Sequence, residues 1–127
     1  TVEQFREGGG TDASLREILE WSHLGGFKCD GVHPSLDDVF EWETALSPGQ
    51  KQRMAFARLF YARPRFAVLD ECTNGVAPSI ESDLYQRLAS LGMAVFSISH
   101  KNELKKHHDF ELHFHANEEG GWDWIEL

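Results

Sequence analysis

Cysteine and positive charge are scarce in this sequence of 127 residues. Its two cysteines, Cys29 and Cys72, form no C-x-x-C pair and are too few for a disulfide scaffold, so we expect reduced thiols. Lys plus Arg number 12 against 21 for Asp plus Glu, and the net charge of −9 argues against a nucleic-acid binder or a protein held on anionic lipid. No apolar run approaches the roughly 20 residues of a membrane-spanning helix, and no secretory leader is visible.

The residues that are present suffice for one packed domain, or for a piece of a larger one. The chain is 41% hydrophobic and 12% aromatic, which is too apolar for wholesale disorder. It begins at Thr1 rather than Met, which suggests a processed chain or one cut from a longer protein.

The first part of the chain predicts helices separated by loops. Residues 1–10 are polar and end in three glycines, so we expect a loose lead-in. A helical period follows, with apolar side chains on one face at Leu15, Ile18 and Leu19. Ser14 and Glu17 have the spacing of a capping box at its start, and Gly25–Gly26 would end it. Residues 35–40 are a candidate short helix, next to the aromatic residues Phe40 and Trp42.

A longer helix is predicted after Leu46. Ser47 is a good N-cap, Pro48 fits the first helical position, and Gln50 completes a capping box. The helix would continue to Ala62 and end before Pro64.

Two short apolar runs follow, at 66–70 and 94–99, and flank a helical segment that begins at Pro78 and stops at Gly92. The first run has the wholly apolar pattern of a strand buried on both faces. Strand, helix and strand in this order predict a βαβ unit with two parallel strands. The fold class is therefore α/β. Beyond it we expect a short basic helix at 102–108.

The C-terminal residues predict a hairpin. Apolar and polar side chains alternate over 110–115, a turn is expected at 117–121, and 122–127 would form the partner strand. We expect Trp122 and Trp124 to pack this hairpin against the sheet, the alternative being an interaction patch.

Three features have the chemistry of a phosphate site. The helix start at Ser47 and Gly49 offers N–H groups, a hydroxyl and close backbone approach. Asp70 and Glu71 follow a buried strand, where a carboxylate can hold Mg²⁺ through water and its neighbour can polarise an attacking water. His100 ends the second strand and would lie on the same edge of the sheet.

In this order and spacing, the three features resemble the C-terminal part of an ATP-binding cassette (ABC) transporter nucleotide-binding domain, a P-loop NTPase fold. Residues 46–50 resemble the LSGGQ signature, 66–71 the Walker B strand with its glutamate, and 98–100 the switch histidine. The Asp-Glu-Cys-Thr string at 70–73 and the Gly-Gly-Trp at 120–122 resemble the peroxisomal subfamily D, of the adrenoleukodystrophy-protein type.

The resemblance implies a role for each matching residue. Asp70 would hold Mg²⁺ through water, Glu71 would act on the attacking water, and His100 would contact the γ-phosphate of ATP. The signature residues would bind the nucleotide of the opposite subunit in a head-to-tail dimer; they are Ser47, Gly49 and Gln50.

The resemblance also implies an organisation for the chain. Residues 1–45 would be part of the helical subdomain that docks on membrane helices, and residues 46–127 the C-terminal part of the cassette core. The whole protein would be an ATPase that drives transport of fatty acids or fatty acyl-CoA. It would work at the cytosolic face of an organelle membrane, the peroxisomal one by analogy, with a transmembrane domain and a second nucleotide-binding domain as partners and no nucleic acid. The piece itself is expected to be soluble.

The sequence departs from the family pattern in three respects. It contains no GxxxxGK(S/T) motif, so the piece alone is predicted to bind ATP weakly and to be inactive. Pro48 replaces a signature glycine and removes one N–H donor, and residues 74–77 differ from the usual D-loop. These changes predict a slower or asymmetric ATPase in the whole protein.

Two other functions and a metal site remain as alternatives. The chain could be a degenerate cassette that serves as an assembly partner, or part of a soluble ABC ATPase. Four histidines could suggest a metal site, although solvated polar side chains are the interpretation we favour; they are His107, His108, His113 and His115.

Overall fold

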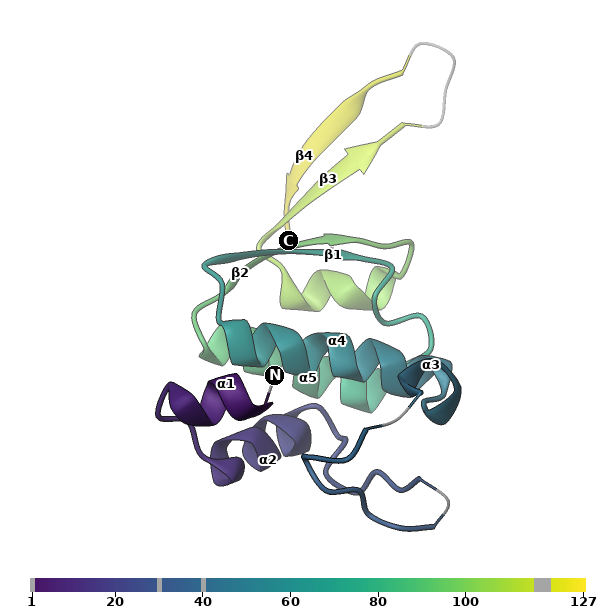
Figure 1. Ribbon diagram of the computed structural model, residues 1–127. Helices are drawn as coiled ribbons and strands as arrows, with labels where there is room; N and C mark the ends of the chain where they lie inside the picture. The colour runs from purple at the N-terminus through teal and green to yellow at the C-terminus, as the bar shows by residue number, and fades with distance from the viewer. Residues whose placement is uncertain (1, 30, 40, 116–119) are drawn as a thin grey trace.

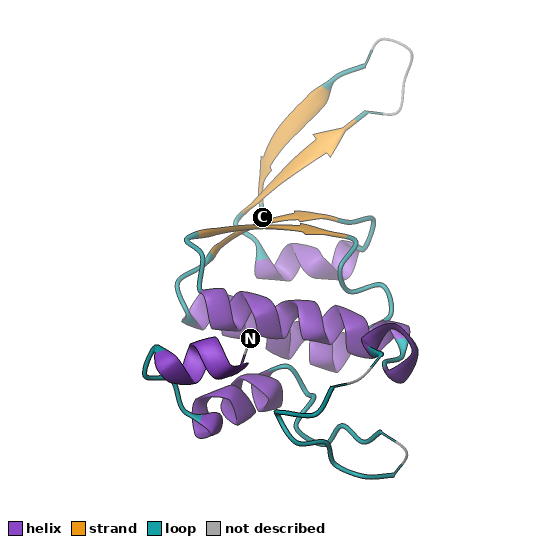
Figure 2. Cartoon of the chain, viewed as in Figure 1, coloured by secondary structure: helices purple, strands orange, loops and turns teal. Residues whose placement is uncertain are grey.

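A computed structural model describes residues 2–29, 31–39, 41–115 and 120–127 (Figures 1 and 2). The elements follow in the order α1 (Val2–Glu7), α2 (Asp12–Trp21), α3 (Trp42–Ala45), α4 (Pro48–Ala62), β1 (Phe66–Asp70), α5 (Pro78–Ser90), β2 (Ala94–Ile98), the 3₁₀ helix η1 (Asn102–His107), β3 (Phe110–Phe114) and β4 (Trp122–Glu126). The helices lie on one side of the β1–β2 sheet, and the β3–β4 hairpin extends away from them (Figure 1).

Helix α4 begins and ends as predicted. The Ser47 hydroxyl accepts the N–H of Gln50 at 3.3 Å, and the Gln50 side chain accepts the N–H of Ser47 at 2.8 Å, so the capping box is complete. Pro48 occupies the first turn. Arg63 ends the helix in the left-handed conformation, with φ 44° and ψ 53°, directly before Pro64.

Strands β1 and β2 pair in parallel, from Phe66 opposite Ala94 to Asp70 opposite Ile98, and α5 forms the crossover. The βαβ unit is therefore confirmed. The expectation that the first strand is buried on both faces is wrong. Ala67 and Leu69 are buried, whereas Phe66 and Val68 are 75% and 71% exposed, because the described helices cover only the inner face.

The core lies between this inner face and the helices. Its four largest fully buried apolar side chains come from α4 and α5 and are Phe56, Phe60, Leu84 and Leu88. They form one cluster with the inward residues of β1, with Ile18 of α2 and with Leu104 of η1. Burial of this cluster supplies the main driving force for packing the helices on the sheet.

The N-terminal region differs from the prediction in two places. Residues 2–7 form α1 rather than a loose lead-in, because the Phe5 ring packs 5.3 Å from that of Tyr61 and Arg6 binds two carboxylates. Helix α2 is capped by Thr11, whose hydroxyl accepts the N–H of Ser14 at 3.2 Å, so the capping box expected at Ser14 is wrong.

Helix α2 ends before the glycine pair that was expected to stop it. Ser22 caps the helix, with its hydroxyl donating to the carbonyl of Ile18 at 2.9 Å, and His23 then takes a positive φ of 54°. The short helix expected at 35–40 is also wrong for 35–39, where the Asp38 carboxylate accepts the N–H of Ser35 in a turn. Phe40 lies outside the described residues, and a short helix forms instead at α3.

The C-terminal elements follow the prediction in order. The basic segment forms η1, and β3 pairs antiparallel with β4, from Phe110 opposite Glu126 to Phe114 opposite Trp122. The turn expected at 117–121 lies mostly outside the described residues. Trp122 and Trp124 are exposed, so their expected packing against the sheet is wrong; Trp124 stacks on Phe110 within the hairpin instead, with ring centres 5.1 Å apart.

Within the described residues, no helix has both the length and the apolar content that a bilayer crossing demands.

Candidate functional site

The carboxyl ends of β1 and β2 meet at one edge of the sheet. Asp70 is the last residue of β1, and the N–H of Glu71 donates to the carbonyl of Ile98 at 3.0 Å, which extends the parallel pairing by one residue. Glu71 has a φ of +44°, a backbone conformation that glycine adopts readily and glutamate does not. This turn directs the Glu71 side chain toward the residues that follow β2.

The Glu71 carboxylate contacts the His100 imidazole there. Glu71 Oε1 lies 3.0 Å from His100 Nδ1, and both side chains remain accessible to solvent. The His100 hydrogen bond holds the pKa of Glu71 below its usual value, so the carboxylate is charged at neutral pH. The other oxygen, Oε2, has no hydrogen-bond partner among the described residues. The structure thus brings together the two residues that were assigned to catalysis.

Asp70 offers a second carboxylate at the same edge. Its side chain is exposed, and none of the hydrogen bonds or ion pairs found within the described residues engages it. Mg²⁺ is commonly held by one or two carboxylates together with waters and phosphate oxygens. The exposed, free carboxylate of Asp70 at the end of β1 fits such an ion bound through water.

The signature residues form a different part of the molecule. Ser47 and Gln50 are engaged in their mutual capping box. Gly49 packs against the backbone of Gly75, and Gly75 donates its N–H to the side-chain oxygen of Gln52 at 2.8 Å. None of these contacts reaches Glu71 or His100. The geometry therefore links the signature to the segment after β1, while leaving it apart from the Glu71–His100 pair.

Sequence reasoning missed a cation that ties the loops of this site together. Lys101 Nζ lies 2.8 Å from Glu81 Oε2 and donates to the Thr73 carbonyl at 2.8 Å. Glu81 is only 3% exposed. The available signal was the position of Glu81, which shares the inward face of α5 with Leu84, Tyr85 and Leu88. A carboxylate on a buried helix face requires a partner.

The four histidines are engaged in local contacts. His107 stacks on Tyr85, and His108 Nε2 lies 2.9 Å from the Ser97 hydroxyl. His113 and His115 lie 3.4 and 3.1 Å from the carboxylates of Glu111 and Asp123. Across the described ranges, no group of three or more His, Cys, Asp or Glu side chains is arranged to hold a metal ion.

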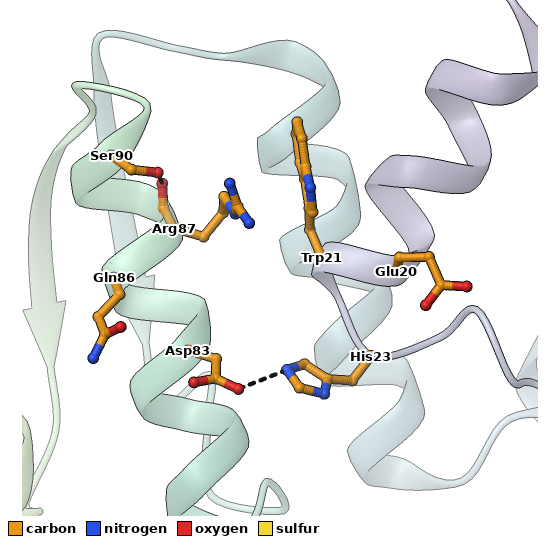
Figure 3. Close-up of a pocket in the computed structure, with 7 residues that line it drawn as sticks. All are labelled: Glu20, Trp21, His23, Asp83, Gln86, Arg87 and Ser90. Atoms are coloured by element: carbon orange, nitrogen blue, oxygen red, sulfur yellow. Dashed lines mark hydrogen bonds and ion pairs between the residues drawn. The ribbon is translucent and has the colours of Figure 1, made fainter.

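A polar groove of about 480 Å³ lies between α2 and α5 (Figure 3). His23 faces Asp83 across it at 3.1 Å, and the Arg87 guanidinium lies 4.6 Å from the centre of the Trp21 ring. The groove contains none of the site residues predicted from the sequence. Two contacts cross it, His23 with Asp83 and Arg87 with Trp21, so we assign the groove to the packing of α5 against α2 and the residues that follow it.

Most of the chain is similar in sequence to known proteins. The family model described as ABC transporter matches residues 3–74. "ABC transporter D family member 2" of Dictyostelium discoideum is 48% identical over 91 residues, which is 72% of this chain and 12% of that protein. "ATP-binding cassette sub-family D member 3" of Mus musculus is 41% identical over 112 residues, 87% of this chain and 16% of that protein.

A third relative carries a more specific name. "Lysosomal cobalamin transporter ABCD4" of Mus musculus is 37% identical over 118 residues, 91% of this chain and 19% of that protein. The chain therefore spans less than a fifth of the length of each of these relatives.

Proposed function

The chain belongs to the ABC transporter family, and from that membership we propose that it is the C-terminal part of the ATP-hydrolysing domain of a subfamily D transporter. The observation that carries the proposal is the contact of Glu71 with His100 at the carboxyl end of a parallel βαβ unit, beside the free carboxylate of Asp70. Ligands of open α/β sheets bind at this edge.

The residues at this edge have separate roles in the proposed mechanism. Glu71 is charged at neutral pH and orients the attacking water. His100 holds the Glu71 carboxylate through Nδ1, and its other ring nitrogen would be available to a γ-phosphate. Asp70 would hold Mg²⁺ through water, and the bound ion would supply charge neutralisation on the phosphates. Positioning and electrostatic stabilisation are the main requirements of phosphoryl transfer.

The signature acts on the nucleotide of a second domain. Ser47 offers a hydroxyl and α4 offers its N-terminal dipole, and Gly49 allows close backbone approach. Gln50 orients this helix start through its hydrogen bond to Ser47. Since these groups lie apart from Glu71 and His100, a head-to-tail pair of domains would let each signature face the other's nucleotide.

The bare face of the sheet supports the idea of a partial domain. Phe66, Val68, Phe96 and Ile98 form the exposed outer face of β1 and β2, which we call the outer sheet face. Strands of parallel sheets are normally covered on both sides. We propose that residues 46–127 are the C-terminal part of the cassette core, that residues 1–45 are part of its helical subdomain, and that the half with the phosphate-binding loop covers this face.

For the whole protein we propose ATP-driven transport of fatty acids or fatty acyl-CoA across an organelle membrane, the peroxisomal one by analogy with subfamily D. Its partners would be a transmembrane domain and a second nucleotide-binding domain. The relative named as a lysosomal cobalamin transporter makes cobalamin the competing cargo. Uptake of labelled acyl-CoA and of labelled cobalamin by vesicles that contain the full-length protein distinguishes the two.

The hydrolytic role is tested by the ATPase rate of the full-length protein. We expect Glu71→Gln to lower kcat by about 100-fold or more, since it keeps the shape of the side chain and removes its charge. A full-rate Glu71→Gln variant would overturn the assignment.

A degenerate assembly partner is the second candidate, favoured by Pro48 in the signature and by the altered segment 74–77. It predicts that the wild-type protein hydrolyses ATP only when it is mixed with a second, intact subunit.

A further inference from the structure

Glu81 is a buried carboxylate whose charge is compensated from another segment of the chain. It lies in the first turn of α5 on the face that packs against the sheet, and it is 3% exposed. Its Oε2 lies 2.8 Å from Nζ of Lys101, whose side chain is itself mostly covered. A buried carboxylate left without a cation is strongly unfavourable, so this pair holds the start of α5 against the loop after β2.

The same ammonium group binds the loop after β1. Lys101 Nζ donates to the carbonyl of Thr73 at 2.8 Å, and Thr73 is buried two residues after Glu71. One cation therefore joins three segments, which are the loop that carries Glu71, the first turn of α5 and the loop that carries His100.

We call the contacts of the Lys101 ammonium group with Glu81 and Thr73 the anchor. The position of Lys101 in the chain connects the anchor to the proposed site. Lys101 directly follows His100, and its N–H donates to the Ser99 hydroxyl at 3.2 Å. The Lys101 side chain is directed inward, whereas His100 is 76% exposed and reaches Glu71 at 3.0 Å. Movement of Lys101 would displace the adjacent imidazole relative to a carboxylate that already sits on a strained turn.

We propose that Lys101 is a positioning residue that, through Glu81 and Thr73, fixes the loop after β2 so that His100 stays in contact with Glu71. The proposal rests on the proposed ATPase function of this site. The anchor needs at least two N–H donors to reach a carboxylate and a carbonyl together, which lysine and arginine provide and methionine does not.

The test uses the ATPase of the full-length protein. We expect Lys101→Met to lower kcat by about tenfold or more while the KM for ATP stays within about twofold, because it disturbs the site without removing a nucleotide contact. Lys101→Arg should restore most of the rate. Lys105→Met is the matched control, since Lys105 forms an ion pair of the same length, 2.8 Å, with Glu111, which has no proposed role in the reaction, and it should leave kcat unchanged.

The double variant shows whether Lys101 acts through His100. In a His100→Ala background, Lys101→Met should cause no further fall in the residual rate. An equal fall in both backgrounds would overturn the proposal, as would a wild-type kcat in Lys101→Met.

Folding is controlled by a second variant. Lys101→Met with Glu81→Gln removes the cation and the buried charge together, so it should keep the wild-type melting temperature and still lose kcat. Recovery of kcat in this double variant would show a purely structural role and overturn the proposal. If instead Glu71→Gln and His100→Ala both hydrolyse ATP at the wild-type rate, the proposed function itself fails.

Discussion

Gly49 packs directly against the backbone of Gly75, so that a Cβ added at Gly49 would overlap the Gly75 carbonyl oxygen. This contact joins the first turn of α4 to the segment between β1 and α5, and the hydrogen bond from the Gly75 N–H to Gln52 reinforces it. The glycine of the signature is therefore required within this chain for packing, in addition to any contact with a nucleotide.

The first prediction concerns this contact. Gly49→Ala should destabilise the protein by about 1–3 kcal/mol, because backbone atoms cannot move aside as a flexible side chain could. Gly26→Ala is the matched control, since a Cβ there meets nothing within 4 Å. Thermal unfolding of the purified variants measures both. A melting temperature of Gly49→Ala equal to that of Gly26→Ala would contradict the packing role.

The second prediction concerns the pH dependence of the N-terminal region. Arg6 contacts Asp12 at 2.6 Å and Asp37 at 2.7 Å, and its hydrogen bonds hold the pKa of each carboxyl below the ordinary 3.8. Because the folded-state pKa values are lowered, this stabilisation is complete above the ordinary value and is lost as pH falls through the folded-state values.

Arg6→Met should therefore raise the pKa of Asp12 and of Asp37 toward the ordinary value, and it should reduce stability at neutral pH but not at pH values below both titrations. Carboxyl NMR titration and thermal unfolding against pH measure the two effects. The control is Arg58→Met, which alters an exposed residue of α4. Unchanged Asp pKa values in Arg6→Met would refute the arrangement.

The third prediction concerns Pro48. Proline at the first helical position stabilises the start of α4 but supplies no N–H donor. Pro48→Gly should raise the ATPase rate of the full-length protein, since it restores a donor at the helix N-terminus, and should lower thermal stability by about 1 kcal/mol or less through increased backbone freedom of the unfolded chain. An unchanged ATPase rate would contradict a role for Pro48 in lowering the rate of hydrolysis.

The fourth prediction concerns nucleotide binding by the isolated chain. The sequence contains no GxxxxGK(S/T) motif, and its net charge is −9, so the residues that would attract and cradle the phosphates of ATP are scarce. Calorimetry should detect no micromolar binding of Mg-ATP to this chain. Micromolar binding would require another phosphate site within it.

The features predicted correctly depend on near neighbours or on long apolar runs. The cap at Ser47 and Gln50 needs only residues three apart, and the pairing of β1 with β2 follows from two apolar strands around one helix. The start of α2 is misplaced because Thr11 and Ser14 are both good caps and their hydroxyls lie 2.8 Å apart.

Other features depend on distant segments and could not be predicted from local pattern. An apolar strand does not show whether both of its faces are covered, and the exposed Phe66 and Val68 show that the described residues leave one face of β1 open. The candidate site was predictable in part, because Asp70, Glu71 and His100 lie at the ends of the two predicted strands. The contacts of Lys101 with Glu81 and Thr73 join two loops and a helix, so only the place of Glu81 on the inward face of α5 indicated them.

Glu71 combines a positive φ with a carboxylate that the proposed reaction needs. Glycine at this position would relax the backbone and lower the free energy of the folded state by about 1 kcal/mol, while eliminating the carboxylate that we propose to orient water. Stability and turnover therefore make opposite demands on this single residue. A screen for thermostable variants would select against glutamate here, and a screen for activity would restore it.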